Sequence, residues 1–152
     1  MAKENTEDLN TFLSVFDESI REKVFWLREF VWDLYPEANE LIYDNYNAVA
    51  FGWSITDKLG DLFCNIAVGR SSKNIQFGFY WGSKLADVDS VLLGKGNQYR
   101  YILVKSMDDF PKEYIKKLLD EAYNYSFEKM KNKIITLKGA TITKSISEKK
   151  RK

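Results

Sequence analysis

The sequence predicts an α+β fold, with an antiparallel β-meander sheet of about four to five strands packed by N-terminal and C-terminal helices. Apolar residues recur at intervals of three and four before residue 36 and again after residue 111. Between them lie four short segments rich in β-branched and aromatic residues. The first three segments are joined by short connections, which favour antiparallel neighbours because a parallel crossover needs a dozen or more residues.

Residues 7–35 are predicted to form a short helix followed by a long one. Asp17 is placed to cap the long helix with its side-chain oxygen. Pro36 marks the end, because the residue before a proline is pushed out of helical conformation. The apolar residues that predict these helices are Leu9, Leu13, Phe16, Ile20, Val24, Leu27, Val31 and Leu34.

The predicted strands are residues 46–53, 62–68, 75–81 and 99–105. Side chains alternate across a strand, so Cys64 shares one apolar face with its neighbours two residues away. We therefore expect Cys64, the single cysteine, to be a small buried apolar residue rather than a reactive thiol. After the last strand, Pro111 suits the first turn of a second packing helix.

The chain divides into a predicted domain, residues 1–128, and a basic tail, residues 129–152. The tail carries nine Lys or Arg residues and one acidic residue, Glu148. It is expected to be partly disordered, with residues 134–137 as a candidate edge strand. A basic tail can neutralise phosphates, which keeps nucleic acid open as a partner, but this one has no aromatic residue for base stacking. Solvation of the tail is the preferred interpretation.

Composition limits the classes of function. The 152 residues fit one domain, 30% of them are charged, and none is histidine. Without histidine the Ser-His-Asp and Cys-His arrangements cannot form, and no nucleophile and base can be named together, so an enzyme has the least support. No apolar run is long enough to span a membrane, and the first ten residues lack an apolar signal core. We expect a cytoplasmic protein.

An acidic face of the long helix, continued by the residues after it, is a candidate metal site. Carboxylates four residues apart on a helix are neighbours, and two or three that converge can hold a cation. The alternative is an ordinary solvated face, because Lys23 and Arg28 interleave and could pair with the acids. The candidate ligands are Glu18, Glu22, Glu29, Asp33, Glu37, Glu40 and Asp44.

A polar and aromatic cluster at the predicted helix-to-sheet junction is a candidate ligand site, formed by Tyr43, Asp44, Tyr46 and Asn47. If these side chains converge on a pocket, Asp44 could act as an acid, a base or a ligand. The structural alternative is that Asp and Asn stabilise a turn through their own backbone. The sequence leaves both interpretations open.

A second candidate ligand site is the glycine turn Gly94-Lys95-Gly96, followed by Arg100. Two glycines can form a nest of backbone N–H groups, to which Lys95 and Arg100 would add positive charge for an anion. The pattern matches neither the Walker loop nor the dinucleotide fingerprint. The alternative is a tight turn that uses glycine for its backbone freedom.

Several motifs together resemble the YdhG-like family of domains of unknown function, over about residues 9–125. The resemblance implies an α+β fold whose antiparallel sheet is flanked by terminal helices. The motifs are Pro36-Glu37-Ala38, Tyr43-Asp44-Asn45-Tyr46-Asn47-Ala48, Phe77-Gly78-Phe79, Trp81-Gly82, Leu93-Gly94-Lys95-Gly96, Arg100 and the helix start that follows Ser106.

Some members of that wider family are described as frataxin-like proteins that handle iron for iron–sulfur cluster assembly. The resemblance implies that the acidic residues above would bind iron weakly. The chain departs from relatives at Val88-Asp89-Ser90 and Tyr101, where they often have Asp-Pro and a His. The prediction is a cytoplasmic binding domain of iron-handling type, and the alternative is a module that binds a protein or a small ligand without metal.

Overall fold

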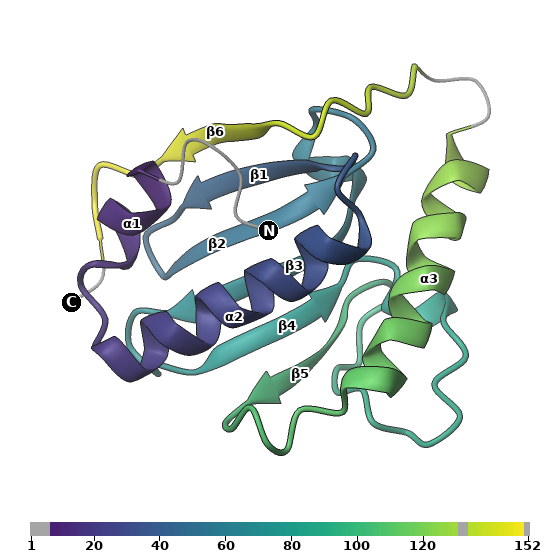
Figure 1. Ribbon diagram of the computed structural model, residues 1–152, viewed down its shortest axis with the longest axis horizontal. Coiled ribbons are helices and arrows are strands. Elements are labelled where there is room, and N and C mark those ends of the chain that lie inside the picture. Colours follow the sequence, from purple (N-terminus) through teal and green to yellow (C-terminus); the bar gives the residue numbers. More distant parts are fainter. Residues whose placement is uncertain (1–6, 131–133, 151–152) are drawn as a thin grey trace.

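The computed structural model describes residues 7–130 and 134–150 and shows an α+β fold in which helices pack on one six-stranded sheet (Figure 1). The α+β prediction is confirmed. Four basic residues of the predicted tail, at positions 131, 133, 151 and 152, lie outside the described residues, as do residues 1–6.

The N-terminal helices are α1 (Glu7–Leu13) and α2 (Glu18–Leu34), in the predicted short and long order. Asp17 caps α2, since its side chain accepts a hydrogen bond of 2.9 Å from the Ile20 N–H. Val31 accepts the last bond of α2 from the backbone N–H of Tyr35, so the helix ends directly before Pro36, as predicted.

The sheet has the strand order β5-β4-β3-β2-β1-β6. Its strands are β1 (Asn39–Asp44), β2 (Ala48–Ser54), β3 (Leu62–Gly69), β4 (Ile75–Phe79), β5 (Arg100–Val104) and β6 (Thr141–Ile146). Strands β1 to β5 are antiparallel neighbours, whereas β6 pairs parallel with β1. The sheet is therefore mixed and has six strands, which corrects the prediction of a purely antiparallel sheet of four to five.

The strand register gives the sheet an apolar face and an outer face. Five buried side chains cross the strands in one row on the apolar face: Ile42, Phe51, Ile66, Phe77 and Ile102. The neighbouring row, on the outer face, is Leu41, Gly52, Asn65, Gly78 and Tyr101. Helix α2 crosses the apolar face in front of β3 and β4 (Figure 1), so its inner side is fixed against the sheet.

Helix α3 (Lys112–Lys129) lies beside one end of the sheet (Figure 1). It follows Pro111, as the sequence predicts, and buries Ile115, Leu118 and Leu119. Short 3-10 helices occur at Leu59–Asp61 and Gly82–Lys84. Within the described ranges, no helix is both long and apolar enough to cross a bilayer.

The chain after α3 returns along β1 and is attached by polar side chains. Asn39 is buried; its amide nitrogen donates to the Thr56 carbonyl at 3.0 Å, and its amide oxygen accepts from Lys138 N at 3.1 Å. The expected edge strand at residues 134–137 is wrong, since these residues are irregular and the edge strand is β6. Residues 134–150 thus run alongside the domain.

Candidate functional site

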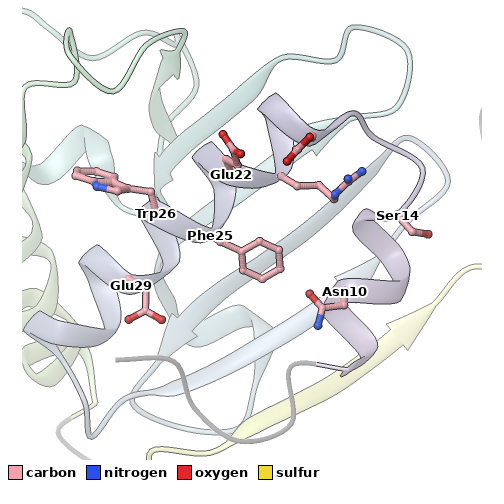
Figure 2. Close-up of a pocket in the computed structure, with 8 residues that line it drawn as sticks. Asn10, Ser14, Glu22, Phe25, Trp26 and Glu29 are labelled. Atoms are coloured by element: carbon pink, nitrogen blue, oxygen red, sulfur yellow. The ribbon is translucent and has the colours of Figure 1, made fainter.

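A groove of about 870 Å³ lies between α1 and α2 and is open to solvent (Figure 2). Asn10 of α1 and Ser14 of the turn after it line one side, and Phe25 projects from α2 into the space between the helices (Figure 2). The full lining is Asn10, Ser14, Glu18, Arg21, Glu22, Phe25, Trp26 and Glu29. It carries three carboxylates and one guanidinium, so its net charge is negative.

Helical periodicity places the acidic groups of the groove on one stripe of α2. Glu18, Glu22, Phe25 and Glu29 follow one another at spacings of four, three and four residues. Residues so spaced lie on one side of a helix. The side of α2 turned away from this stripe buries Val24, Leu27 and Val31, and Arg28 and Trp32 are buried between the two sides. We name the stripe Glu18, Glu22, Phe25 and Glu29 the acidic stripe.

The turn between α1 and α2 holds the two walls of the groove together. Leu13 and Phe16 are buried, which anchors the end of α1 and the turn in the core. Arg21, in the first turns of α2, donates a hydrogen bond to the Phe16 carbonyl. One face of the groove is therefore built from chain segments that cannot separate without disrupting the core.

Trp26 forms the other rim of the groove and remains 37% exposed. Its ring stacks on Phe30, with centroids 5.8 Å apart, and meets Phe110 edge-on at 5.8 Å. The ammonium of Lys112 lies 5.8 Å from its centroid. These contacts fix the indole on the surface next to the acidic stripe, where an apolar group of a ligand can pack.

Glu40, one of the predicted metal ligands, is fully buried in an ion pair with Arg28 of α2. Arg28 donates from Nε to Glu40 Oε2 and from Nη2 to Oε1, each at 2.6 Å. The hydroxyl of Thr141 in β6 donates to Oε1 at 2.9 Å. Both carboxylate oxygens therefore accept from protein groups, and Glu40 joins α2, β1 and β6.

Asp44, predicted both as a metal ligand and as a ligand-binding group, is also buried and paired. Its carboxylate accepts from the guanidinium of Arg70 and from the ammonium of Lys150. Arg70 also donates to the Asn45 carbonyl at 3.1 Å. Asp44 thus links the β1–β2 turn to the C-terminal segment.

The remaining predicted metal ligands do not gather into one centre. Glu18, Glu22 and Glu29 line the groove, whereas Glu37 lines a separate hollow of about 350 Å³ between the end of α2 and α3, together with Asp120 and Tyr123. Asp33 is exposed near the end of α2. Across residues 7–130 and 134–150, no group of three or more His, Cys, Asp or Glu side chains is arranged to hold a metal ion.

The structure separates the side chains of the Tyr43 to Asn47 cluster. Tyr43 and Asp44 are consecutive residues of β1 and so point to opposite faces of the sheet. Tyr46 is 44% exposed in the turn that follows, and Asn47 is exposed while its carbonyl accepts from Arg70 N at 2.8 Å. The four predicted residues do not converge on one pocket.

Tyr43 instead belongs to a hydrogen-bonded network on the outer face of the sheet. Asn65 donates to the Tyr43 hydroxyl at 2.9 Å, and the Tyr43 and Tyr80 hydroxyls lie 3.0 Å apart. Tyr99 donates to the Asn65 amide oxygen at 2.9 Å and accepts from Gln76 at 2.9 Å. Burial raises the pKa of Tyr99 to about 12 and also raises the pKa values of Tyr43 and Tyr80. These phenols are neutral hydrogen-bonding groups at physiological pH.

The glycine turn holds Arg100 through carbonyl groups. The Arg100 guanidinium donates to Gly96 O at 2.7 Å and to Tyr99 O at 2.8 Å. Gly94 has a φ of +120°, a conformation that L side chains rarely adopt, so glycine is needed there. Lys95 is exposed beside it. The Arg100 guanidinium, which was predicted to bind an anion, therefore donates hydrogen bonds that stabilise the turn.

The sequence predictions did not include Arg21, Phe25 or Arg70 among the site residues. Arg70 follows a predicted strand and was visible as a charged residue next to an apolar run. Its partner Asp44 is 26 residues away, so no local pattern signals the pair. Cys64 is buried, as predicted, and burial raises the pKa of its thiol well above the ordinary value.

Comparisons with protein-family models, with curated proteins and with solved structures found no match to this chain.

Proposed function

We propose that this protein is a cytoplasmic binding domain of the YdhG-like type that takes up a basic segment of another protein in the groove between α1 and α2. The observation that carries the proposal is the lining of that groove, which combines Glu18, Glu22 and Glu29 with the rings of Phe25 and Trp26. Carboxylates attract Lys and Arg, and exposed aromatic rings add apolar contact and cation–π attraction.

The size and openness of the groove favour a polypeptide over a small molecule. Small-molecule sites bury most of their ligand and range from about 300 to 1,000 Å³. At about 870 Å³ this groove is near the upper end of that range, yet it is open to solvent and would leave a small ligand exposed. A peptide needs no enclosure, because it contacts the groove along its length.

A peptide titration followed by backbone NMR tests the proposal. A flexible peptide of Lys and Leu is expected to shift the amide signals of Glu18, Glu22 and Phe25, and a Glu and Leu peptide of equal length is expected not to. Glu22→Gln should weaken binding, and Glu113→Gln, at an exposed site on α3, should leave binding unchanged. Shifts confined to other surfaces, or equal shifts with both peptides, contradict the proposal.

Iron handling, which the family resemblance implies, is the second candidate function. One observation favours it: Glu18, Glu22 and Glu29 line the same groove, and carboxylate oxygens can ligate metal ions weakly. Against it, Glu40 and Asp44 already hold buried cationic side chains. Anaerobic titration with ferrous iron tests this candidate, and unchanged amide signals over residues 18–44 at millimolar metal would remove it.

A further inference from the structure

We infer that the groove takes its partner as an α-helix whose basic residues and one apolar residue follow the same four–three–four spacing as the acidic stripe. This inference rests on the proposed function and adds the conformation and register of the bound segment. It concerns a partner protein with a basic amphipathic helix.

The spacing of the acidic stripe is the first support. In the stripe Glu18, Glu22, Phe25 and Glu29, the first and last residues are eleven positions apart, which is roughly 16 Å along α2 at 1.5 Å per residue. Alternating spacings of three and four place one apolar group between charged groups on a straight line. A second helix lying along α2 repeats its side chains at the same intervals, so three ion pairs and one apolar contact form together.

The dimensions of the groove are the second support. A helix about 10 Å across that rises 5.4 Å per turn fills roughly 420 Å³ per turn. The groove, at about 870 Å³ and open to solvent, therefore takes about two of the roughly three turns along which the acidic stripe extends. Helices commonly pack in this way, with their axes 8–10 Å apart, into the groove between two others.

Charge complementarity selects the partner chemistry. Three of the eight lining residues are carboxylates and one is Arg21, whose guanidinium is used on the Phe16 carbonyl. A basic helix is attracted and an acidic helix is repelled. Phe25 lies in the middle of the stripe, so a Leu-sized side chain between the basic residues packs against its ring.

The experiment compares three labelled peptides by fluorescence anisotropy at low and physiological salt. One carries Lys and a central Leu in the four–three–four order on an Ala and Gln background. The second has the same composition in scrambled order, and the third has Pro in its centre. The ordered peptide is expected to bind about tenfold more tightly than the other two, because only it forms three ion pairs at once.

A charge swap tests the register. Glu22→Lys is expected to weaken binding of the ordered peptide, and replacing the second Lys of that peptide by Glu is expected to restore it. Glu113→Lys serves as the matched control, because this residue lies on α3 outside the groove. Restoration with Glu22→Lys and not with Glu113→Lys supports a fixed helical register.

The outcomes separate this inference from the function on which it rests. Binding of all three peptides with equal affinity refutes the helix and leaves the basic-segment function standing. Binding of none refutes the function itself. The protein is also passed over a size-exclusion column with and without excess ordered peptide. If it elutes as a dimer in both cases, a second copy of the chain occupies the groove, and the inference is overturned.

Discussion

Replacing Glu40 by Gln is expected to destabilise the fold more than any exposed charge substitution. Glu40 is 0% exposed and Arg28 is 1% exposed, so the change leaves a guanidinium buried without its carboxylate. The amide nitrogen of Gln also turns an N–H toward the N–H groups of Arg28, where an oxygen accepted before. Removing one partner of a buried pair costs about 3–5 kcal/mol.

A loss of about 3–5 kcal/mol is large compared with the total free energy of unfolding of such a domain. Domains of this size unfold with about 5–15 kcal/mol, so the substitution removes a third or more of the stability in most of that range. For about 150 residues, each kcal/mol lowers the melting temperature by roughly 2–4 °C, which predicts a fall of about 6–20 °C. Urea titration followed by tryptophan fluorescence measures the change, with Glu113→Gln as the exposed control.

The double substitution Arg28→Met with Glu40→Leu distinguishes the mechanism. With both charges gone, most of the lost stability should return, because buried ion pairs are often replaced by apolar residues at little cost. The Thr141 hydroxyl still loses its acceptor, for about 1 kcal/mol. If Glu40→Gln lowers the free energy of unfolding by less than about 1 kcal/mol, the pair behaves as an exposed one and the argument fails.

Three further predictions use the same urea titration. Gly78→Ala should cost about 1–3 kcal/mol, because a Cβ there overlaps the Tyr99 ring, whereas Gly60→Ala, with nothing within 4 Å of its Cβ, should cost far less. The pKa of Tyr99 rises from 10.0 unfolded to about 12 folded, so its contribution to stability is complete below pH 10 and declines as the pH rises toward 12; Tyr99→Phe should flatten that decline. Asp44→Asn should cost about 3–5 kcal/mol, because it leaves the buried guanidinium of Arg70 without a carboxylate. Lys150→Met should cost less than about 1 kcal/mol, because the lysine side chain is 31% exposed. Equal costs would contradict the assignment of Arg70 as the main partner of Asp44.

The helices and strands β2 to β5 were predictable because their signals are local. The Asp17 cap, the apolar period of α2 and the alternation around Cys64 each lie within a few residues of what they specify. Strand β1 was not predicted, because Glu40 and Asp44 occupy its core-facing positions and break the apolar alternation. The cationic partners of these two carboxylates are Arg28 in α2 and Arg70 after β3. Both are distant in sequence, so no local pattern signals the pairs.

The position of the edge strand depends on similarly distant contacts. Residues 134–137 have the more apolar sequence, but Thr136 N donates to Ile55 O at 2.8 Å, and Asn39 holds the backbone at Lys138. Those bonds keep the segment irregular and bring β6 alongside β1. The candidate site has the same origin, because the spacing of the acidic stripe is visible in the sequence whereas the groove needs the position of α1.

The buried ion pair between Arg28 and Glu40 also fixes the direction in which the groove residues of α2 point. Arg28 lies between Phe25 and Glu29 in sequence and is bonded through two nitrogens to Glu40, so α2 cannot turn about its axis without breaking both bonds. The acidic stripe is thereby held in one orientation, and in the proposed complex this reduces the entropy cost of binding. The Arg28→Met and Glu40→Leu double variant removes this restraint while restoring the fold. The variant should therefore unfold at nearly the same urea concentration as the unsubstituted protein but bind the ordered helical peptide more weakly. Unchanged peptide affinity in that variant would show that apolar packing alone orients α2.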